Sequence, residues 1–244
     1  MTGEVGYTDL VNIVLFDLDD TLLDYSGGVE ESWRRAVLAC GRDGGCDPEQ
    51  LVAALAQSRR WFWEDSRRNR LERTNMARAW HRIATHALES LGAGDDALAG
   101  TIARHFAANR RETMQLFPES RETLERLRAQ GTPLGLITNG DAVQQRYKIE
   151  HHDLARYFDV IVIEGEFGTG KPDEVVFRHA LASLGADPAD ASMVGDSLLH
   201  DVDGARRLGI RGVWIDRPGA GLPADSPVKP DHIIASLTEL HDLG

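Results

Sequence analysis

Six short apolar segments recur along the chain, and their pattern is the first guide to its fold. None alternates strictly between apolar and polar residues, which is typical of strands covered on both faces in a parallel sheet. The segments are VNIVLF (11–16), PLGLIT (133–138), DVIVIE (159–164), ASMVGD (191–196), IRGVWID (210–216) and DHIIAS (231–236). Helical patterns separate them from residue 133 onward. This alternation predicts an α/β fold with a doubly wound, mostly parallel sheet and a Rossmann-like core.

Two of the helical patterns carry signals at their ends. ESRETLERLRAQG is expected to end at Gly131, and PDEVVFRHALASLG to begin at Pro172 and end at Gly185. Proline suits the first turn of a helix, and glycine suits the position just past the last turn.

The alternation of strand and helix is interrupted between about residues 25 and 113. That region is polar and helical, with breaks near GRDGGCDP, around residues 69–74 and at GAGDD, which divide it into four expected helices. An all-helical domain inserted after the first strand explains the interruption. The sequence therefore predicts an α/β core of residues 1–22 and 114–244, and an inserted helical cap domain of residues 23–113.

Composition narrows the range of partners. The net charge of -12 and the pI of about 5.2 argue against binding to a nucleic-acid polymer or an acidic membrane. No segment approaches the ~20 apolar residues of a membrane span, and the amino terminus has no signal-peptide pattern. We expect a cytoplasmic monomer or homodimer. Cys40 and Cys46 complete no zinc signature, and we expect them to be free thiols.

Polar side chains follow four of the expected strands, and the first of these is the most acidic. In VLFDLDDTLLD, Asp17 and Asp19 share one face of an extended segment. The other strand ends supply Thr138 with Asn139, Lys171, and Asp196 with Ser197 and Asp201. A single aspartate after a strand is usually a turn former or a helix cap. Four such ends in one sheet instead indicate a ligand site, because the carboxyl ends of parallel strands meet at one edge.

The motifs DLDDT, LITNG, GKP and GDSLLHD occur in this order and resemble those of the haloacid dehalogenase-like hydrolases. The helical insert is similar to the small cap of that superfamily, so the resemblance covers the whole chain. The nearest resemblance is to small-cap phosphatases of nucleotides, phosphoglycolate, and sugar or acylneuraminate phosphates. It implies an enzyme that hydrolyses the phosphate monoester of a small metabolite with Mg²⁺ as cofactor.

The resemblance also implies roles for individual residues. Asp17 would be the nucleophile that forms an aspartyl-phosphate, and Asp19 the general acid and base. Mg²⁺, a hard ion that prefers oxygen ligands, would be bound by the carboxylates of Asp17 and Asp196 and the main-chain carbonyl of Asp19. Lys171 would neutralise charge on the nucleophile and the phosphoryl group.

Further residues would support this chemistry. Thr138 and Asn139 would bind phosphoryl oxygens, Asp201 would hold Lys171 or a metal-bound water, and Ser197 and Thr21 would brace the site. Because dehalogenases of the superfamily lack an acid at the position of Asp19, the pair favours phosphate-ester hydrolysis. One departure is KPDE, with Glu174, where relatives commonly have KPDP.

Alternatives remain open at this point. A phosphomutase uses the same aspartyl-phosphate, and a non-catalytic protein that binds a phospho-ligand could share the fold, although the complete motif set argues against lost activity. In the insert, RRWFWEDSRRNRLER (59–73) has two interpretations. It is either a cationic, aromatic surface that binds the leaving group, or an exposed helix face whose arginines pair with Glu64, Asp65 and Glu72 while its aromatic side chains pack inside the cap. Its helical spacing favours the second interpretation.

Overall fold

The computed structural model of the chain describes residues 13–40 and 46–243. The chain divides into two compact units. The core unit comprises the residues up to Leu23, Leu116–Thr138 and the residues from Ile149 onward, and the helical unit comprises Asp24–Gln115 and Asn139–Lys148. The helical unit therefore takes in residues 139–148 in addition to the insert.

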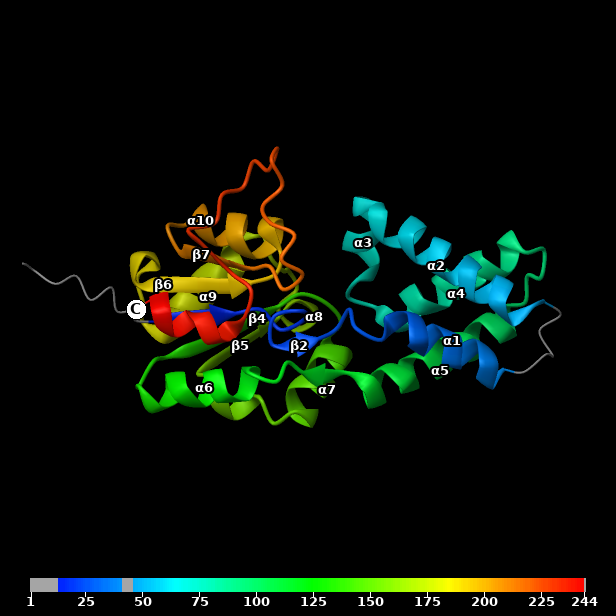
Figure 1. Cartoon of the computed structure of the whole chain (residues 1–244), viewed down its shortest axis with the longest axis horizontal. Coiled ribbons are helices and arrows are strands. Elements are labelled where there is room, and N and C mark those ends of the chain that lie inside the picture. The colour runs from blue at the N-terminus through cyan, green and yellow to red at the C-terminus, as the bar shows by residue number, and fades with distance from the viewer. Residues whose placement is uncertain (1–12, 41–45, 244) are drawn as a thin grey trace, which may run out of the picture. The chain divides into compact units, whose positions relative to one another are not determined.

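Six parallel strands form the sheet of the core unit (Figure 1), in the order β5-β4-β1-β6-β7-β8. Each lies within a segment expected from the sequence, so the predicted α/β fold with a doubly wound sheet is confirmed. The strands are β1 (Ile13–Phe16), β4 (Leu134–Thr138), β5 (Val160–Ile163), β6 (Ala191–Gly195), β7 (Arg211–Ile215) and β8 (His232–Ile234). Residues 11 and 12 of the first expected strand lie outside the described residues.

The middle of this sheet is covered on both faces. Every residue of β1, β4 and β6 is buried, which explains why their sequences are continuously apolar. Helix α6 (Ser120–Ala129) lies on one side of the sheet, and α9 (Glu174–Leu184) and α10 (Gly204–Arg206) lie on the other (Figure 1). Smaller elements complete the unit: α8 (Glu164–Phe167), the 3₁₀ turns Ala155–Tyr157, Pro188–Asp190 and Leu237–Leu243, and a π-helical turn, η4 (Leu198–Asp203).

The ends of the core helices follow local capping chemistry. Helix α6 stops at Ala129, before Gly131, and α9 is followed by Gly185 in a left-handed conformation, as expected. The start of α9 was predicted wrongly. The side chain of Asp173 caps this helix by accepting a hydrogen bond from the Val175 N–H, so the helix begins at Glu174 and not at Pro172.

The described part of the insert, residues 23–113, contains five helices, where the sequence predicted four. They are α1 (Val29–Ala39), α2 (Pro48–Glu64), α3 (Ser66–Glu72), α4 (Met76–Ser90) and α5 (Asp96–Thr113). The unexpected break falls at Asp65, whose side chain accepts a hydrogen bond from the Arg68 N–H at 2.7 Å and starts α3. Helix α7 (Ala142–His151) begins in the helical unit and ends in the core unit.

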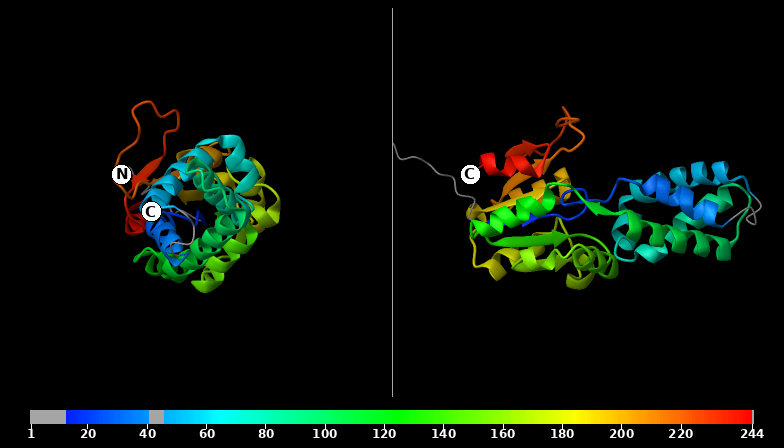
Figure 2. Two further views of the ribbon diagram at one scale, coloured as in Figure 1. Left: turned by 90° about the vertical axis from the view of Figure 1, so that its right-hand side faces the viewer. Right: turned by 60° about the horizontal axis from the view of Figure 1, so that its bottom comes forward.

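Aromatic packing gives the helical unit a core of its own. Trp33 of α1 stacks on Phe106 of α5 with ring centroids 3.8 Å apart, and these two helices lie side by side in both views (Figures 1 and 2). Trp61 lies between the His86 ring and the Arg68 guanidinium, at 3.8 and 3.7 Å. Trp61 and Arg68 therefore contribute to packing within the unit, as the simpler interpretation of residues 59–73 requires.

Three smaller features complete the description. Leu23–Asp24 (β2) and Gln115–Leu116 (β3) pair as a two-stranded sheet that the sequence pattern did not predict. Cys40 and Cys46 are free thiols, as expected. Among the described residues, no helix is both long and apolar enough to cross a membrane.

Candidate active site

Asp17 directly follows the central strand β1, and its environment fixes both carboxylate oxygens. Its backbone N–H continues the sheet by donating to the Val194 carbonyl at 2.9 Å. Lys171 Nζ donates to Asp17 Oδ1 at 2.6 Å, and the Thr21 hydroxyl donates to Oδ2 at 3.2 Å. Asp17 is only 7 % exposed. A buried carboxylate with one bond to each oxygen is held in a single orientation.

Lys171 joins Asp17 to a second buried carboxylate. Its Nζ lies 2.6 Å from Asp17 Oδ1 and 2.6 Å from Asp201 Oδ1, and the Lys171 side chain is only 2 % exposed. Burial lowers the pKa of the Lys171 ammonium, but the charges of Asp17 and Asp201 outweigh burial and raise this pKa above its usual value. Lys171 is therefore a permanently charged cation between two acids.

The π-helical turn η4 returns Asp201 to the site. Asp201 Oδ2 accepts a hydrogen bond from the Ser197 N–H at 2.9 Å, and the Ser197 hydroxyl in turn accepts from the His200 N–H at 3.2 Å. Gly195 is the last residue of β6, and a Cβ atom there would lie 2.2 Å from Asp201 Oδ2. The carboxylate thus occupies the space that any other residue at position 195 would fill.

Thr21 connects the ends of β1 and β6. Its hydroxyl donates to Asp17 and accepts a hydrogen bond from the Asp196 N–H at 3.1 Å. On its other side, the Asp196 carbonyl accepts a hydrogen bond from the Trp214 indole N–H at 2.7 Å. The backbone at Asp196 is therefore held from both sides.

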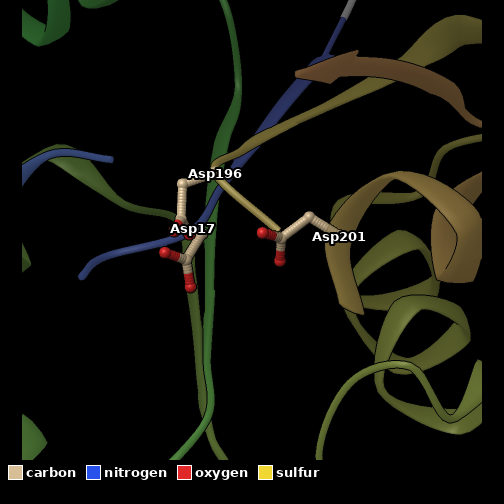
Figure 3. Close-up of side chains that lie close together, drawn as sticks. All are labelled: Asp17, Asp196 and Asp201. Atoms are coloured by element: carbon tan, nitrogen blue, oxygen red, sulfur yellow. The ribbon is translucent and has the colours of Figure 1, made fainter. Parts of the chain in front are cut away.

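Three carboxylates, those of Asp17, Asp196 and Asp201, lie close enough together to bind one cation. One oxygen from each lies within 4.8 Å of the others (Figure 3). When all three acids are ionised, the Lys171 ammonium compensates one of the three negative charges. Burial raises the pKa of Asp17 to about 7, against the lowering effect of Lys171. Desolvation, followed by the charges of Asp17 and Asp201, raises the pKa of Asp196 as well.

Three carboxylates beside one ammonium leave the site short of positive charge when all three acids are ionised. A divalent cation with a preference for carboxylate and carbonyl oxygen, such as Mg²⁺, fits this donor set. Asp201 is the most deeply buried of the three acids, at 1 % exposed, and Lys171 and the Ser197 N–H engage its two oxygens.

Thr138 and Asp19 lie at the same edge of the sheet. Thr138 is the buried last residue of β4, the strand that pairs with β1. Asp19 is half-buried and forms a β-bridge with Leu23. Asn139 follows Thr138 but belongs to the helical unit, where its carbonyl accepts a hydrogen bond from Gln145 Nε2 at 3.0 Å.

The structure thus brings six of the predicted residues into one connected set of contacts: Asp17, Thr21, Lys171, Asp196, Ser197 and Asp201. It also adds residues that the sequence analysis missed. Trp214 and Arg217 come from β7 and the segment after it, and Glu119 precedes α6. The strand IRGVWID ends at the same sheet edge, and extending the strand-end argument to this fifth strand would have pointed to Arg217.

A model of the haloacid dehalogenase-like hydrolases matches residues 11–209, and the chain belongs to this family. Its relatives include a phosphoserine phosphatase of Thermus thermophilus, 33% identical over 94% of this chain and 98% of the relative. The N-acylneuraminate-9-phosphatase of Rattus norvegicus is 31% identical over 94% of this chain and 92% of the relative. The ribulose-1,5-bisphosphate 5-phosphatase of Halopiger xanaduensis is 32% identical over 96% of this chain and 99% of the relative.

Solved structures share the fold. A 2-haloacid dehalogenase from Pseudomonas syringae has a TM-score of 0.66 and 31% identity, with coverage of 95% of this chain and 97% of that one. The HAD-hydrolase YfnB from Bacillus subtilis has a TM-score of 0.76 at 20% identity, with the same coverage. The predicted family is confirmed, and the relatives identify the chain as a phosphatase of that family.

Proposed function

We propose that this enzyme hydrolyses the phosphate monoester of a small metabolite through an aspartyl-phosphate on Asp17, in a reaction that depends on Mg²⁺. The contacts of Asp17 are the main support for this proposal. Its carboxylate follows the central strand, and the Lys171 ammonium and the Thr21 hydroxyl each hold one of its oxygens. Both bonds leave lone pairs on these oxygens, so the carboxylate is oriented without being blocked.

In the first half of the reaction, an oxygen of Asp17 attacks phosphorus and the bond between phosphorus and the leaving oxygen breaks. Asp19 donates a proton to that oxygen, so the product departs as an alcohol. Thr138 donates a hydrogen bond to a phosphoryl oxygen, with Asn139 beside it, and Lys171 offsets the negative charge that builds up.

In the second half, water attacks the phosphorus of the aspartyl-phosphate. Asp19, now ionised, accepts a proton from this water, and the bond between phosphorus and Asp17 breaks. Inorganic phosphate leaves, and Asp17 and Asp19 return to their starting states. Asp201 and Ser197 keep Lys171 in place throughout.

The residues that would hold Mg²⁺ are Asp17 and Asp196, through their carboxylates, and Asp19, through its main-chain carbonyl. When bound, the ion would act as a Lewis acid that offsets the charge of the phosphate and of the crowded acids. We assign Asp201 to Lys171 and not to the ion, because Asp201 is the most deeply buried of the three acids and its Oδ1 lies 2.6 Å from Lys171 Nζ.

The similarity to a 2-haloacid dehalogenase raises a second reaction within the family. Asp19 supports phosphate-ester hydrolysis instead, because an ester needs a proton on its leaving oxygen and a departing halide does not. Substrates of the relatives are small phosphorylated metabolites, and we propose the same class here.

We further propose that the helical insert, residues 23–113, acts as the cap that selects the substrate, and that the enzyme is a cytoplasmic monomer or homodimer.

The proposal is tested by measuring phosphate release from phosphoserine, sugar phosphates, nucleotides and phosphoglycolate with Mg²⁺ present. Asp17→Asn is the blank, because this change removes the nucleophilic charge and preserves the side-chain shape. We expect turnover of at least one ester above the blank. Equal rates in the two proteins would contradict the mechanism. Activity that requires a bisphosphate activator and releases no net phosphate would indicate a phosphomutase.

A further inference from the structure

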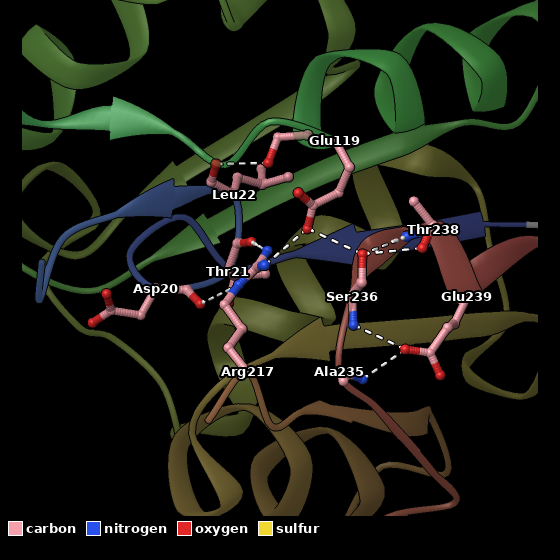
Figure 4. A network of polar contacts seen from close by, with 10 residues as sticks. Asp20, Thr21, Leu22, Glu119, Arg217, Ala235, Ser236, Thr238 and Glu239 are labelled. Atoms are coloured by element: carbon pink, nitrogen blue, oxygen red, sulfur yellow. Dashed lines mark hydrogen bonds and ion pairs between the residues drawn. The ribbon is translucent and has the colours of Figure 1, made fainter. Parts of the chain in front are cut away.

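The loop after the proposed nucleophile is held by an arginine that follows another strand of the same sheet. Arg217 follows β7, which is separated from β1 by β6. Its Nε donates to the Asp20 carbonyl at 3.2 Å, and one terminal nitrogen donates to the Thr21 carbonyl at 2.6 Å (Figure 4). The other terminal nitrogen donates to Glu119 Oε1 at 2.8 Å. The fork geometry of a guanidinium makes such a three-way contact possible.

The position of Arg217 is itself fixed. Its guanidinium carbon lies 3.3 Å from the centroid of the Phe117 ring, and its side chain is 18% exposed. Burial raises the pKa of Glu119, but the hydrogen bond and charge of Arg217, together with backbone hydrogen bonds, outweigh burial and hold this pKa below its usual range. Glu119 also accepts from the Ser236 hydroxyl at 3.3 Å (Figure 4). Arg217 is thus held by an ion pair with Glu119 and by a cation–π contact with Phe117.

The loop needs this support because of its conformation. Asp20 has a φ of 59°, a left-handed conformation that few residues other than glycine adopt. The Leu18 carbonyl accepts hydrogen bonds from the N–H groups of both Leu22 and Leu23, at 3.0 Å each. This tight turn directs the carbonyls of Asp20 and Thr21 to Arg217, while the Thr21 hydroxyl contacts Asp17 and the Asp196 N–H.

We propose that Arg217 is a positioning residue for this reaction, which acts through Thr21 on the orientation of Asp17 and on the backbone of Asp196. The inference rests on the proposed function for its kinetic consequences. Arg217 holds the carbonyl of Thr21, and the hydroxyl of the same residue bridges the two aspartates. A shift of the loop would therefore move the nucleophile and one proposed metal ligand together.

The first test compares Arg217→Ala with wild type in phosphate release. A nucleophile displaced by about 1 Å can cost roughly 10²-fold in rate, so we expect kcat to fall at least about tenfold with little change in KM. Millimolar guanidinium chloride should restore part of the lost kcat in Arg217→Ala, whereas equal sodium chloride should not. Arg178→Ala is the matched control, since its pairing with Glu174 at 3.0 Å is exposed and remote from these residues.

A double-mutant cycle tests the route through Thr21. If Arg217 acts through this residue, Arg217→Ala should reduce kcat much less in a Thr21→Val background than in the wild type. Additive losses would overturn the route. A folded Arg217→Ala protein with kcat within about twofold of wild type would overturn the positioning role. If Arg217→Ala does not fold, Arg217→Gln takes its place, because it keeps an amide donor and lacks the fork.

Hydrogen exchange supplies a readout that does not depend on turnover. The amides of residues 20–23 and Asp196 should exchange faster in either Arg217 variant, while those of β7 stay unchanged. Unchanged exchange at residues 20–23 would overturn the inference. Wild-type turnover no higher than that of Asp17→Asn would instead overturn the proposed function, and hydrogen exchange would still decide the role of Arg217.

Discussion

The carboxylate of Asp201 lies against the bare backbone of Gly195, where a Cβ atom would lie 2.2 Å from Asp201 Oδ2. Two rigid features meet here, the end of β6 and the π-helical turn η4, so neither can easily give way. Asp201 also pairs with Lys171, and any displacement is therefore passed on to the ammonium beside Asp17.

Gly195→Ala should consequently reduce activity without contacting the substrate. We expect kcat to fall by about 10²-fold, because Lys171 loses its anchor and the site loses its geometry. The matched control is Gly94→Ala, where the new Cβ would lie 3.8 Å from Glu89 Cγ, an ordinary contact. Steady-state kinetics of both variants check the prediction, and wild-type kcat in Gly195→Ala would contradict it.

Lys171→Met should destabilise the protein as well as inactivate it. Removing one member of a buried ion pair leaves uncompensated charge and typically costs about 3–5 kcal/mol. Urea unfolding in EDTA measures this loss in the free energy of unfolding. Arg178→Met, which breaks an exposed pair, should cost no more than about 1 kcal/mol. Equal stability losses in the two variants would show that Lys171 is not the structural cation we describe.

Removal of divalent metal should stop turnover, and added Mg²⁺ should restore it. The same ion should stabilise the folded protein by about 2.7 kcal/mol when its concentration is a hundred times its dissociation constant. Thermal unfolding with and without Mg²⁺ measures the effect. In Asp196→Asn the stabilisation should be much smaller, because a proposed ligand has lost its charge. Persistent turnover in EDTA would rule out the metal assignment.

The stability of the metal-free enzyme should fall as the pH rises from about 4 to about 7. Folding raises the pKa of Asp17 from 3.8 to about 7, so in this window the unfolded state has released a proton that the folded state retains. Stability therefore decreases with pH across the window, and Asp196, whose pKa is raised to about 8, extends the decrease to higher pH. Urea unfolding at a series of pH values in EDTA measures this slope. Asp17→Asn should flatten it, and an unchanged slope would exclude Asp17 as its source.

Much of the fold could be predicted because its signals are local. Each strand of the sheet is a buried, apolar segment, and the aspartates that follow β1 and β6 stand out against such segments. The break at Asp65 was missed because it lies within a continuous charged pattern that suits an exposed helix. Asp65 is a favoured N-cap residue type, and the hydrogen bond from the Arg68 N–H shows that a new helix begins there. Local pattern is a poor guide where one side chain decides between two helical paths.

The residues of the site also fall into two groups, those that local sequence could identify and those that it could not. Asp17, Lys171 and Asp196 could be chosen from their types and their places after strands. Arg217 could not be recognised by type, because its partners are main-chain carbonyls, which every residue carries. Its role depends on a turn nearly two hundred positions earlier in the chain, as the separation of Arg217 from Thr21 shows. The position of Arg217 after β7 could have been noticed from the sequence, but its contacts with the loop after β1 become visible only in the structure.

The pairing of β2 with β3 has a consequence for how the chain folds during synthesis. The strand β1 leaves the ribosome long before its neighbours β4 and β6, because the segment Asp24–Gln115 follows β1 and precedes both of them in the chain. That segment is nearly self-contained, and its two ends meet where Leu23–Asp24 pairs with Gln115–Leu116. Once the segment Asp24–Gln115 has folded, β1 and α6 are joined by the short β2–β3 pair instead of a long flexible loop. This reduces the entropy that is lost when β1 pairs with β4 and β6. The insert can thus be accommodated in the middle of the core with little cost to its assembly.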